Sequence, residues 1–380
     1  MRNGIGDKEG WWGKVENAKI SPGQLFALLV LFNLGTAILR VLAIDAEKDA
    51  WLAILLGAIG GLFLFYIYVS LYRQYPNLPL TGYMRAILGK WIGWPLGLIY
   101  VLFFIHGAAR DLREGGDLLA ASVLDQTPLI VLNIVMIFSI AYVLNKGFEV
   151  LARTAQIFFS IFLIFAAISG LLLYFSGVID INRLLPVLAK GWGPVNETTL
   201  KQTFQFPHEE VICFAMVLPY LANRKKGIRA GYLAVIVSVL ILAYSTAMNV
   251  AVLGVDISAR AVFPLLHTIS LINIGEFIQR LDVFVVLTLI LGDFYKTAIF
   301  YYAVVIAAAD VFQIQDHKKL VNYVGLIILF ISMMLTGNFA EQIEEGNVLL
   351  DTFFLAFGGI IPFILYVVAK LRKTFSSART

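Results

Sequence analysis

The sequence is poor in charge and in cysteine. Only 14% of its 380 residues are Asp, Glu, Lys or Arg, whereas 60% are hydrophobic, a balance that excludes an ordinary soluble domain. The net charge of +4 is too small to suggest a nucleic-acid partner. Cys213 is the only cysteine, so no disulfide can form within the chain. The rest of the sequence is a series of apolar stretches of about 18 residues or more, which predict an all-α polytopic membrane protein.

Motifs of the common enzyme classes are also missing. The sequence contains no Gly-rich phosphate loop, no paired Cys/His spacing for a metal and no nucleophile elbow. His208 and Glu209 lack the second histidine of a zinc-protease helix. Residues 1–20 lack the apolar core and cleavage site of a signal peptide, so we expect them to form a cytoplasmic N-terminal segment. We therefore expect no catalytic residues, no metal and no cofactor.

Apolar windows predict ten transmembrane helices in a single transmembrane domain, residues 21–370. The predicted spans are Pro22–Ala43, Trp51–Tyr72, Ile92–Ala121, Pro128–Leu144, Leu151–Phe175, Thr203–Leu221, Ile228–Leu253, Ile274–Asp310, Leu320–Thr336 and Asp351–Val368. They divide into two sets of five with opposite orientation, at about residues 21–176 and 200–370, as inverted repeats do. Most Lys and Arg residues outside the spans fall on one side, which the positive-inside rule makes cytoplasmic. Both termini, including the tail at residues 371–380, are therefore expected in the cytoplasm.

The eighth span, Ile274–Asp310, is long for one transmembrane helix. It can be a single tilted helix, or it can break near Gly292. A full break would add an eleventh span and move the basic tail outside, so the charge distribution favours ten spans. Asp310 lies at the cytoplasmic end of this span, where we expect solvent to reach it.

Two spans carry residues that interrupt a helix. The sixth holds Phe206, Pro207, His208 and Glu209 in sequence. Pro207 removes a backbone donor and clashes with the preceding turn, so the helix must kink or unwind there. The first span holds Gly35 near its midpoint, where glycine unwinds at little steric cost. Gly35 alone is also consistent with a close helix–helix contact, but the pair of breaks is typical of an inverted-repeat transporter fold.

Polar and ionisable groups gather near mid-membrane on four of these spans, where their burial is costly and marks a functional site. Free backbone N–H groups beyond Gly35 suit a carboxylate, and Glu209 suits an ammonium, so the expected ligand is a small zwitterion or polar nutrient. An interior histidine can instead be structural, and Lys296 can simply pair with Asp293, three residues away. The candidate ligand-binding residues are Gly35, Thr36, Ala37, His106, Gly107, Phe206, His208, Glu209 and Lys296.

Charged residues also recur in the outer half of the third span. Arg110, Arg113 and Asp117 follow one helical face, and the eighth span supplies further charges at similar depth. Charges there need partners, so we expect ion pairs that act either as an outer gate or as static packing. The expected ion-pair network consists of Arg110, Arg113, Glu114, Asp117, Arg280 and Asp282.

Several motifs resemble one known family. The stretch Asn33-Leu34-Gly35-Thr36-Ala37-Ile38-Leu39 looks like the broken first helix of amino acid/polyamine/organocation permeases. The more specific motifs are Gly89-Lys90-Trp91-Ile92-Gly93, Asp180-Ile181-Asn182-Arg183-Leu184-Leu185-Pro186-Val187-Leu188, Gly191-Trp192-Gly193-Pro194 and Arg280-Leu281-Asp282. Their order and spacing, from about Ile20 to Phe375, resemble the spore germination permease family.

This resemblance implies a LeuT-like fold of two inverted five-helix repeats in the inner membrane of a bacterial endospore. It implies a nutrient-sensing B subunit of a germinant receptor, often responsive to an amino acid, that works with an A subunit and a lipoprotein C subunit. The family's ligand lies between the broken first and sixth helices, with help from the third and eighth. That site maps here onto Gly35, Gly107, Glu209, Tyr295 and Lys296. His208 departs from the small residue that many relatives carry before this acid, and Lys296 is unusual in a pocket for a neutral amino acid.

Two other functions fit the same residues, because a fold does not settle a function. One is a proton-coupled amino-acid transporter, in which Glu209, His106 or His208 would relay the proton. The other is an ion or water pathway that a partner subunit gates.

Overall fold

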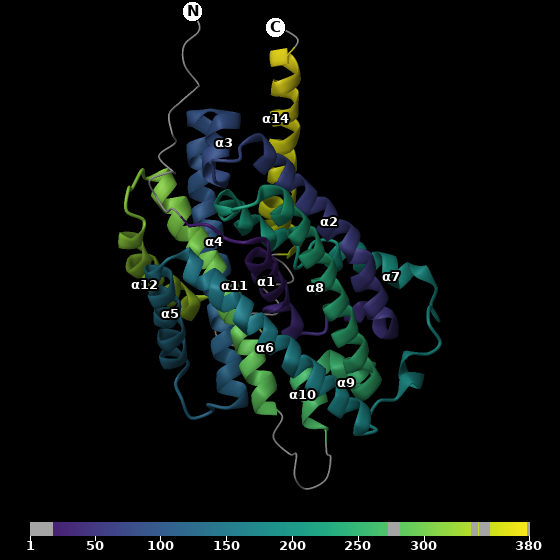
Figure 1. Cartoon of the computed structure of the whole chain (residues 1–380). Coiled ribbons are helices and arrows are strands. Elements are labelled where there is room, and N and C mark those ends of the chain that lie inside the picture. The colour runs from purple at the N-terminus through teal and green to yellow at the C-terminus, as the bar shows by residue number, and fades with distance from the viewer. Residues whose placement is uncertain (1–17, 273–281, 336–340, 342–349, 378–380) are drawn as a thin grey trace, which may run out of the picture.

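The computed structural model describes residues 18–272, 282–335, 341 and 350–377. In these residues the chain is predominantly helical and forms no named strand (Figure 1). The C-terminal part of α14 (Ile361–Ser377) and the short helix α3 (Leu80–Leu88) lie at one end of the molecule, at the top of Figure 1. The short helices α9 (Val255–Arg260) and α10 (Pro264–Ser270) lie at the opposite end.

The helices can be grouped by the two repeats that the sequence predicts. The first repeat contains α1 (Pro22–Leu34), η2 (Ala37–Leu39), η3 (Ile44–Asp49), α2 (Ala50–Gln74), α3, α4 (Lys90–Ser122), α5 (Leu129–Lys146) and α6 (Phe148–Phe175). The second, with the segment that leads into it, contains η4 (Ile181–Leu184), α7 (Trp192–Thr198), η5 (Thr199–Thr203), η6 (Glu209–Met216), η7 (Leu218–Tyr220), α8 (Arg224–Leu253), α9, α10, α11 (Asp282–Val311), α12 (Lys318–Met334), η8 (Leu350–Ile360) and α14. Of the η elements, η5 and η8 are π-helical and the others are 3₁₀-helical.

Seven helices in the described part of the chain are long and apolar enough to cross a membrane. They are Ile44–Gln74, Lys90–Ser122, Leu129–Lys146, Phe148–Phe175, Arg224–Leu253, Phe284–Val311 and Thr352–Arg372. The other three predicted spans correspond to the short helix α1, the interrupted segment from α7 to η7, and α12. The seven helices and these three elements are compatible with the ten spans that the sequence predicts.

Both predicted helix breaks are present. Helix α1 begins at a capping box formed by Ser21 and Gln24 and ends at Gly35, whose backbone (φ −10°, ψ −105°) is not helical. The chain then makes the single turn η2 and becomes extended at Arg40. In the sixth element the chain leaves helical structure after η5, passes through Pro207 and resumes as η6. Proline and glycine therefore end these helices as their backbone chemistry requires.

The first and sixth elements are tied together on both sides of their breaks. Near the start of α1, the Ile20 N–H donates to the Tyr220 carbonyl over 3.0 Å, and the Ala222 N–H donates to the Ile20 carbonyl over 3.0 Å. Beyond the break, the Ala43 N–H donates to the side-chain oxygen of Gln202 over 2.9 Å. These hydrogen bonds link the first element directly to the sixth. A displacement of either broken element would therefore displace the other or break the bonds.

The eighth predicted span begins at Ile274, outside the described residues, and its described part forms the unbroken helix α11 (Asp282–Val311), which passes straight through Gly292. A Cβ placed on Gly292 would lie 3.5 Å from the Cα of Gly35. Glycine therefore brings α11 close to the break after α1. Helix α11 makes its most extensive contact with α4 and also packs on α1, so these three elements form the centre of the bundle (Figure 1).

The sixth element begins earlier than the sequence suggests. The predicted span starts at Thr203, whereas α7 and η5 already form a continuous helical path from Trp192 to Thr203. Polar residues such as Glu197 and Lys201 lower the hydropathy of this stretch, so an apolar window misses it. This helical path packs across α2 before it reaches the break. At the break, a Cβ on Gly61 of α2 would lie 2.6 Å from the ring of His208.

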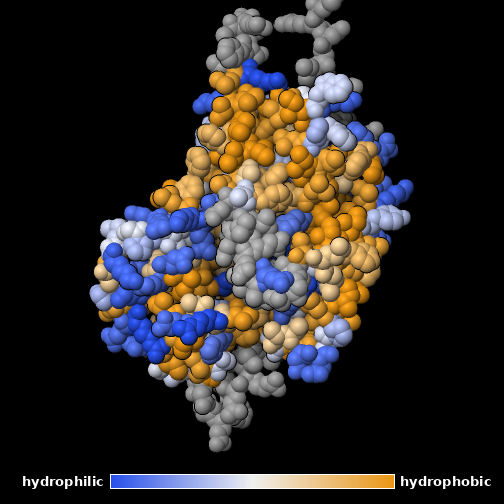
Figure 2. Space-filling model, turned by 180° about the vertical axis from the view of Figure 1, so that it is seen from behind, coloured by the Kyte–Doolittle hydropathy of each residue, from blue (hydrophilic) through white to orange (hydrophobic). Residues whose placement is uncertain are grey.

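The surface is strongly apolar where lipid would meet it. Figure 2 shows a broad hydrophobic area on one face, with hydrophilic side chains gathered at its lower left. On α6 the large side chains of Ile164, Leu171 and Tyr174 are exposed. Such exposure of large apolar side chains is typical of a bilayer-facing or subunit-facing helix face.

The expectation that solvent reaches Asp310 is wrong. Its side chain is buried, the Thr81 hydroxyl donates to Oδ2 over 2.5 Å, and Arg85 Nη2 donates to Oδ1 over 2.5 Å. Both partners belong to α3, which covers the end of α11. The indole N–H of Trp94 adds a hydrogen bond to the Val311 carbonyl over 3.1 Å.

Asp310→Ala should lower the apparent midpoint of thermal unfolding in detergent, because it removes the carboxylate that accepts from Arg85 and Thr81. Loss of hydrogen bonds to a charged group costs about 2 kcal/mol. Asp125→Ala, in the exposed turn after α4, is the matched control and should leave the midpoint unchanged. Equal midpoints for the two variants would show that Asp310 does not hold α3 against α11.

Candidate functional site

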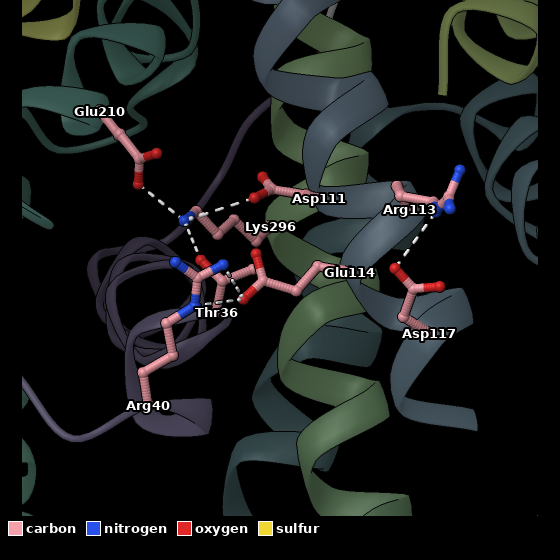
Figure 3. A network of polar contacts seen from close by, with 8 residues as sticks. All are labelled: Thr36, Arg40, Asp111, Arg113, Glu114, Asp117, Glu210 and Lys296. Carbon is pink, nitrogen blue, oxygen red and sulfur yellow. Dashed lines mark hydrogen bonds and ion pairs between the residues drawn. The ribbon is translucent and has the colours of Figure 1, made fainter. Parts of the chain in front are cut away.

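Lys296 of α11 lies at the centre of a buried polar cluster (Figure 3). Its side chain is 1% exposed, and its Nζ lies 2.7 Å from Glu210 Oε2 of η6 and 3.5 Å from Asp111 Oδ1 of α4. The same Nζ donates to Thr36 Oγ1, directly after the break of α1, over 2.5 Å. One ammonium group therefore connects both interrupted elements to the two long central helices.

Two aromatic rings complete the surroundings of the Lys296 ammonium. Its Nζ lies 5.3 Å from the ring centre of Phe206 and 5.8 Å from that of Phe32. A cation at this distance from an aromatic face is attracted by the ring quadrupole. Both rings come from residues close to a break, so the breaks supply aromatic as well as polar partners to the cation.

A second ion pair lies beside this cluster. Arg40 Nη2 lies 2.9 Å from Glu114 Oε1, and the Arg40 Nε donates to the same oxygen over 3.0 Å. Arg40 also lines a cavity of about 220 Å³ at the end of the molecule where α9 lies, together with Arg110, Gln202, Phe206 and neighbouring residues. Figure 3 shows the Arg40–Glu114 pair next to Thr36 and Lys296. Arg40 thus lies between the cavity and the buried cluster.

The expected outer ion-pair network is divided in the structure. Arg113 Nε lies 3.1 Å from Asp117 Oδ2, one turn along α4, and Arg113 Nη1 donates to the Ser332 carbonyl of α12 over 3.4 Å. Figure 3 shows this pair directed away from Lys296. Glu114 instead pairs with Arg40. Arg110 is buried, with its guanidinium carbon 5.8 Å from the ring centre of Phe354.

Two members of that network cannot be placed from the described residues. Arg280 and the side chain of Asp282 lie outside them. Four of the six members are therefore described, and they have three different surroundings: Ser332 of α12 for the Arg113–Asp117 pair, Arg40 for Glu114 and the Phe354 ring for Arg110.

The sequence-derived ligand residues also fall into two groups. Gly35, Thr36, Phe206 and Lys296 converge: the Thr36 hydroxyl and the Phe206 ring face the Lys296 ammonium, and a Cβ on Gly35 would lie 2.8 Å from Lys296 Cδ. Ala37 is buried in the turn η2 that follows. The structure thus gathers the residues at the first break around the lysine of α11.

The other candidates lie against different elements. The His106 ring is 5.7 Å from that of Phe353, and Gly107 is in close contact with Phe300. The Tyr295 ring lies 6.0 Å from that of Phe158. These three residues therefore pack between α4, α6, α11 and η8.

His208 and Glu209 face α2 and η8. His208 packs on Gly61, as described above, and the carbonyl of Glu209 accepts a hydrogen bond of 3.3 Å from the Tyr68 hydroxyl. A Cβ on Gly358 would lie 2.5 Å from the Glu209 Cβ. The acid that reaches Lys296 is the next residue, Glu210.

Sequence analysis therefore missed three residues of the cluster: Arg40, Asp111 and Glu210. All three are ionisable residues inside predicted apolar spans, which was the signal that could have found them. Which of two adjacent charged residues faces a given neighbour depends on the phase of the helix, and the local 3₁₀ geometry of η6 changes that phase.

Asp293 does not form the ion pair with Lys296 that the spacing allows, because Lys296 is engaged by Glu210 and Asp111. Within the part of the chain that the structure describes, no group of three or more His, Cys, Asp or Glu side chains is arranged to hold a metal ion.

Comparison with known proteins gives a consistent result. A family model described as "Spore germination protein" matches residues 19–340. Spore germination protein KB of Bacillus subtilis (strain 168) is 39% identical over 360 residues, which cover 94% of this chain and 96% of the relative. Spore germination protein YndE of the same organism is 23% identical over 363 residues, covering 94% and 98%.

Two solved structures share the fold at low sequence identity. The nucleobase-cation-symport-1 family transporter Mhp1, with bromovinylhydantoin bound, has a TM-score of 0.67 at 13% identity and covers 92% of this chain and 78% of its own. The manganese transporter of Eremococcus coleocola has a TM-score of 0.56 at 12% identity, covering 96% and 81%. The architecture is thus the LeuT-like fold of membrane transporters, with broken first and sixth elements.

Lys296→Met should destabilise the protein strongly, because it leaves the Glu210 and Asp111 carboxylates buried without their cation. Removal of one partner from a buried ion pair costs about 3–5 kcal/mol. Lys201→Met is the matched control: Lys201 Nζ lies 2.7 Å from Glu197 Oε1, the same separation, but both side chains are largely exposed. The control should leave thermal and denaturant stability unchanged. Similar losses in both variants would contradict the central position given to Lys296.

Proposed function

This chain belongs to the spore germination protein family, and on that premise we propose that it is the nutrient-sensing membrane subunit of a spore germinant receptor. The family match covers most of the chain and the fold is that of membrane transporters. A transporter fold supplies a ligand site between two halves that can open and close. In the proposed function, the protein uses that site to detect a nutrient.

The observation that carries this proposal is the Lys296 cluster, which joins both helix breaks to the central helices. We place the ligand beside Thr36, Phe206 and Lys296, reached through the cavity lined by Arg40. Positive groups there attract a carboxylate, and the carboxylates Asp111 and Glu210 attract an ammonium, so a small zwitterion such as an amino acid fits the charges. Gly35 and Ala37 shape the break next to it. Of the other candidates, His106, Gly107, His208, Glu209 and Tyr295 stay predictions.

The Arg40–Glu114 pair is the proposed outer gate of this site. It separates the cavity from Lys296, and Glu114 is almost completely buried whereas the Arg40 side chain is 21% exposed. A ligand carboxylate that competes for Arg40 releases Glu114 and changes how the extended segment after η2 is held. Binding then shifts the population of two arrangements of the repeats, which a partner subunit can detect.

The surroundings of the protein follow from the same proposal. We propose the inner membrane of the endospore as its location, with both termini in the cytoplasm. Its partners would be a germinant receptor A subunit and a lipoprotein C subunit. The exposed apolar side chains of α6 and neighbouring helices are available for lipid or for such partners.

Binding of radiolabelled amino acids and sugars to the purified protein tests the function, followed by uptake into proteoliposomes with and without a pH gradient. We expect saturable binding without uptake. Proton-driven uptake would instead identify a transporter, and uptake of ions or water only in the presence of a partner would identify a gated pathway.

The same assay tests the position of the site. Gly35→Leu should reduce binding at least about tenfold, a loss of about 1.4 kcal/mol, because a Cβ at this position would lie 2.8 Å from Lys296 Cδ and the larger side chain would displace the lysine. Gly193→Leu is the matched control, since a Cβ there meets nothing within 4 Å. Unchanged binding by folded Gly35→Leu protein would remove this break from the ligand site, whereas loss of binding in both variants would indicate a general effect of the substitution.

A further inference from the structure

Asp293 of α11 is a buried carboxyl group that the proposed ligand site does not use. Its side chain is 0% exposed, and neither of its oxygens has a hydrogen-bond partner among the described residues. An isolated carboxylate in such surroundings is very unfavourable, and burial drives it to its neutral form. Asp293 therefore needs either a proton or a cation.

The fold leaves space for this carboxyl group. On the facing helix α4 the residue is Gly115, where any Cβ would collide with Asp293 Oδ2 and would lie 3.2 Å from Met136 Cε of α5. Glycine at this point lets the carboxyl group lie in the interface of α4 and α11. The site is thus built for Asp293 although the group makes no polar contact in the described part of the chain.

The charged groups that act on Asp293 come from α4 and from α11 itself. Helix α4 presents Asp111 and Glu114, and α11 itself presents Lys296. Helix α5 presents the uncharged Met136, and α1 approaches α11 at the same level through Gly35. An ionised Asp293 would be a further carboxylate around an ammonium that already serves Asp111 and Glu210, so the proton is the partner that fits.

Lys296 gives Asp293 a second possible partner. The two residues are three apart on one helix, so their side chains can meet on the same face. In the arrangement described, Lys296 is directed to Glu210 of η6, Thr36 after α1 and Asp111 of α4. When the two broken elements separate from α11, the ammonium loses Glu210 and Thr36 and keeps Asp111, and Asp293, one turn away on its own helix, is placed to replace Glu210.

We propose that Asp293 is a proton-binding residue whose proton is released when the Lys296 ammonium moves from Glu210 to Asp293 as the breaks open. The carboxyl O–H bond breaks, the proton passes to water, and the resulting carboxylate pairs with the ammonium. This proposal adds proton linkage to the ligand site proposed above. Its test needs no ligand, so it can hold or fail independently of whether the chain binds a nutrient.

The sign of the linkage follows directly. In the closed arrangement Lys296 pairs with Glu210 and Asp293 keeps its proton; in the open arrangement Lys296 pairs with ionised Asp293. The closed arrangement therefore holds one proton more than the open one, so a rise in pH favours opening and a fall in pH favours closure. Release of one proton changes the equilibrium constant by at most about tenfold per pH unit.

Cys213 provides a built-in reporter of opening. It is the only cysteine of the chain, lies in η6 three residues after Glu210, and is fully buried in the closed arrangement. Its rate of alkylation by N-ethylmaleimide in the full-length protein in liposomes therefore reports how often η6 opens. Cys213→Ser protein gives the background.

The experiment compares wild type with Asp293→Asn from about pH 5 to pH 9. Asparagine mimics the protonated acid but cannot ionise, so the variant should stay closed. Because the same thiol reacts in both proteins, their ratio of rates cancels the pH dependence of alkylation itself. We expect the ratio of wild type to variant to rise with pH by up to about tenfold per unit within its transition.

Asp256→Asn, at an exposed position of α9, is the matched control and should keep the wild-type pH profile. A constant ratio between wild type and Asp293→Asn across the whole range would overturn the proposal, as would loss of the pH dependence in the control. If Asp293→Asn does not fold, the wild-type rate divided by the rate of the denatured chain at each pH gives the same test. A flat quotient would then overturn the proposal.

Discussion

The structure depends on one cation held where water is scarce. A lysine ammonium inside an apolar bundle is stable only if anionic and polar groups surround it. Glu210, Asp111 and Thr36 meet that need for Lys296, and they come from three separate elements. The cost of leaving any of these charges alone makes the elements close around one another. This constraint explains why two helices can be interrupted in mid-bundle without loss of order.

The same constraint makes the site responsive. The broken elements are joined to α4 and α11 by apolar packing, such as Phe32 on Phe300, and also by charge. The Arg40–Glu114 ion pair likewise joins the segment after the first break to α4, and it lies nearer to the cavity than Lys296 does. A charged or zwitterionic ligand can replace a partner in the Arg40–Glu114 pair and in the Lys296 cluster, whereas an apolar molecule cannot. Signalling in the proposed receptor would thus use the differential affinity of a ligand for two sets of ion pairs.

Sequence reasoning predicted the parts of this fold that local chemistry controls. Gly35 and Pro207 end helices because of their backbones, and apolar windows found the long helices. It failed where tertiary contacts decide. Polar residues lowered the hydropathy of α7 and η5, so apolar windows missed both. Asp310 was expected to meet solvent, but α3 covers it. The phase of η6 directs Glu210, and not Glu209, to Lys296. Asp111 and Arg40 were likewise missed, since their roles follow from the partner that each side chain meets. Convergence of Thr36, Phe206 and Lys296 required only that both breaks lie at one depth.

A double-mutant cycle between Lys296 and Glu210 measures the central interaction most directly. The free energy of unfolding would be determined for the wild type, Lys296→Met, Glu210→Gln and the double variant in the same detergent. The account predicts an interaction energy of about 2 kcal/mol or more, because each single change leaves the other group buried without its partner. Effects that add to within about 0.5 kcal/mol would contradict it, since the ammonium and the carboxylate would then contribute independently.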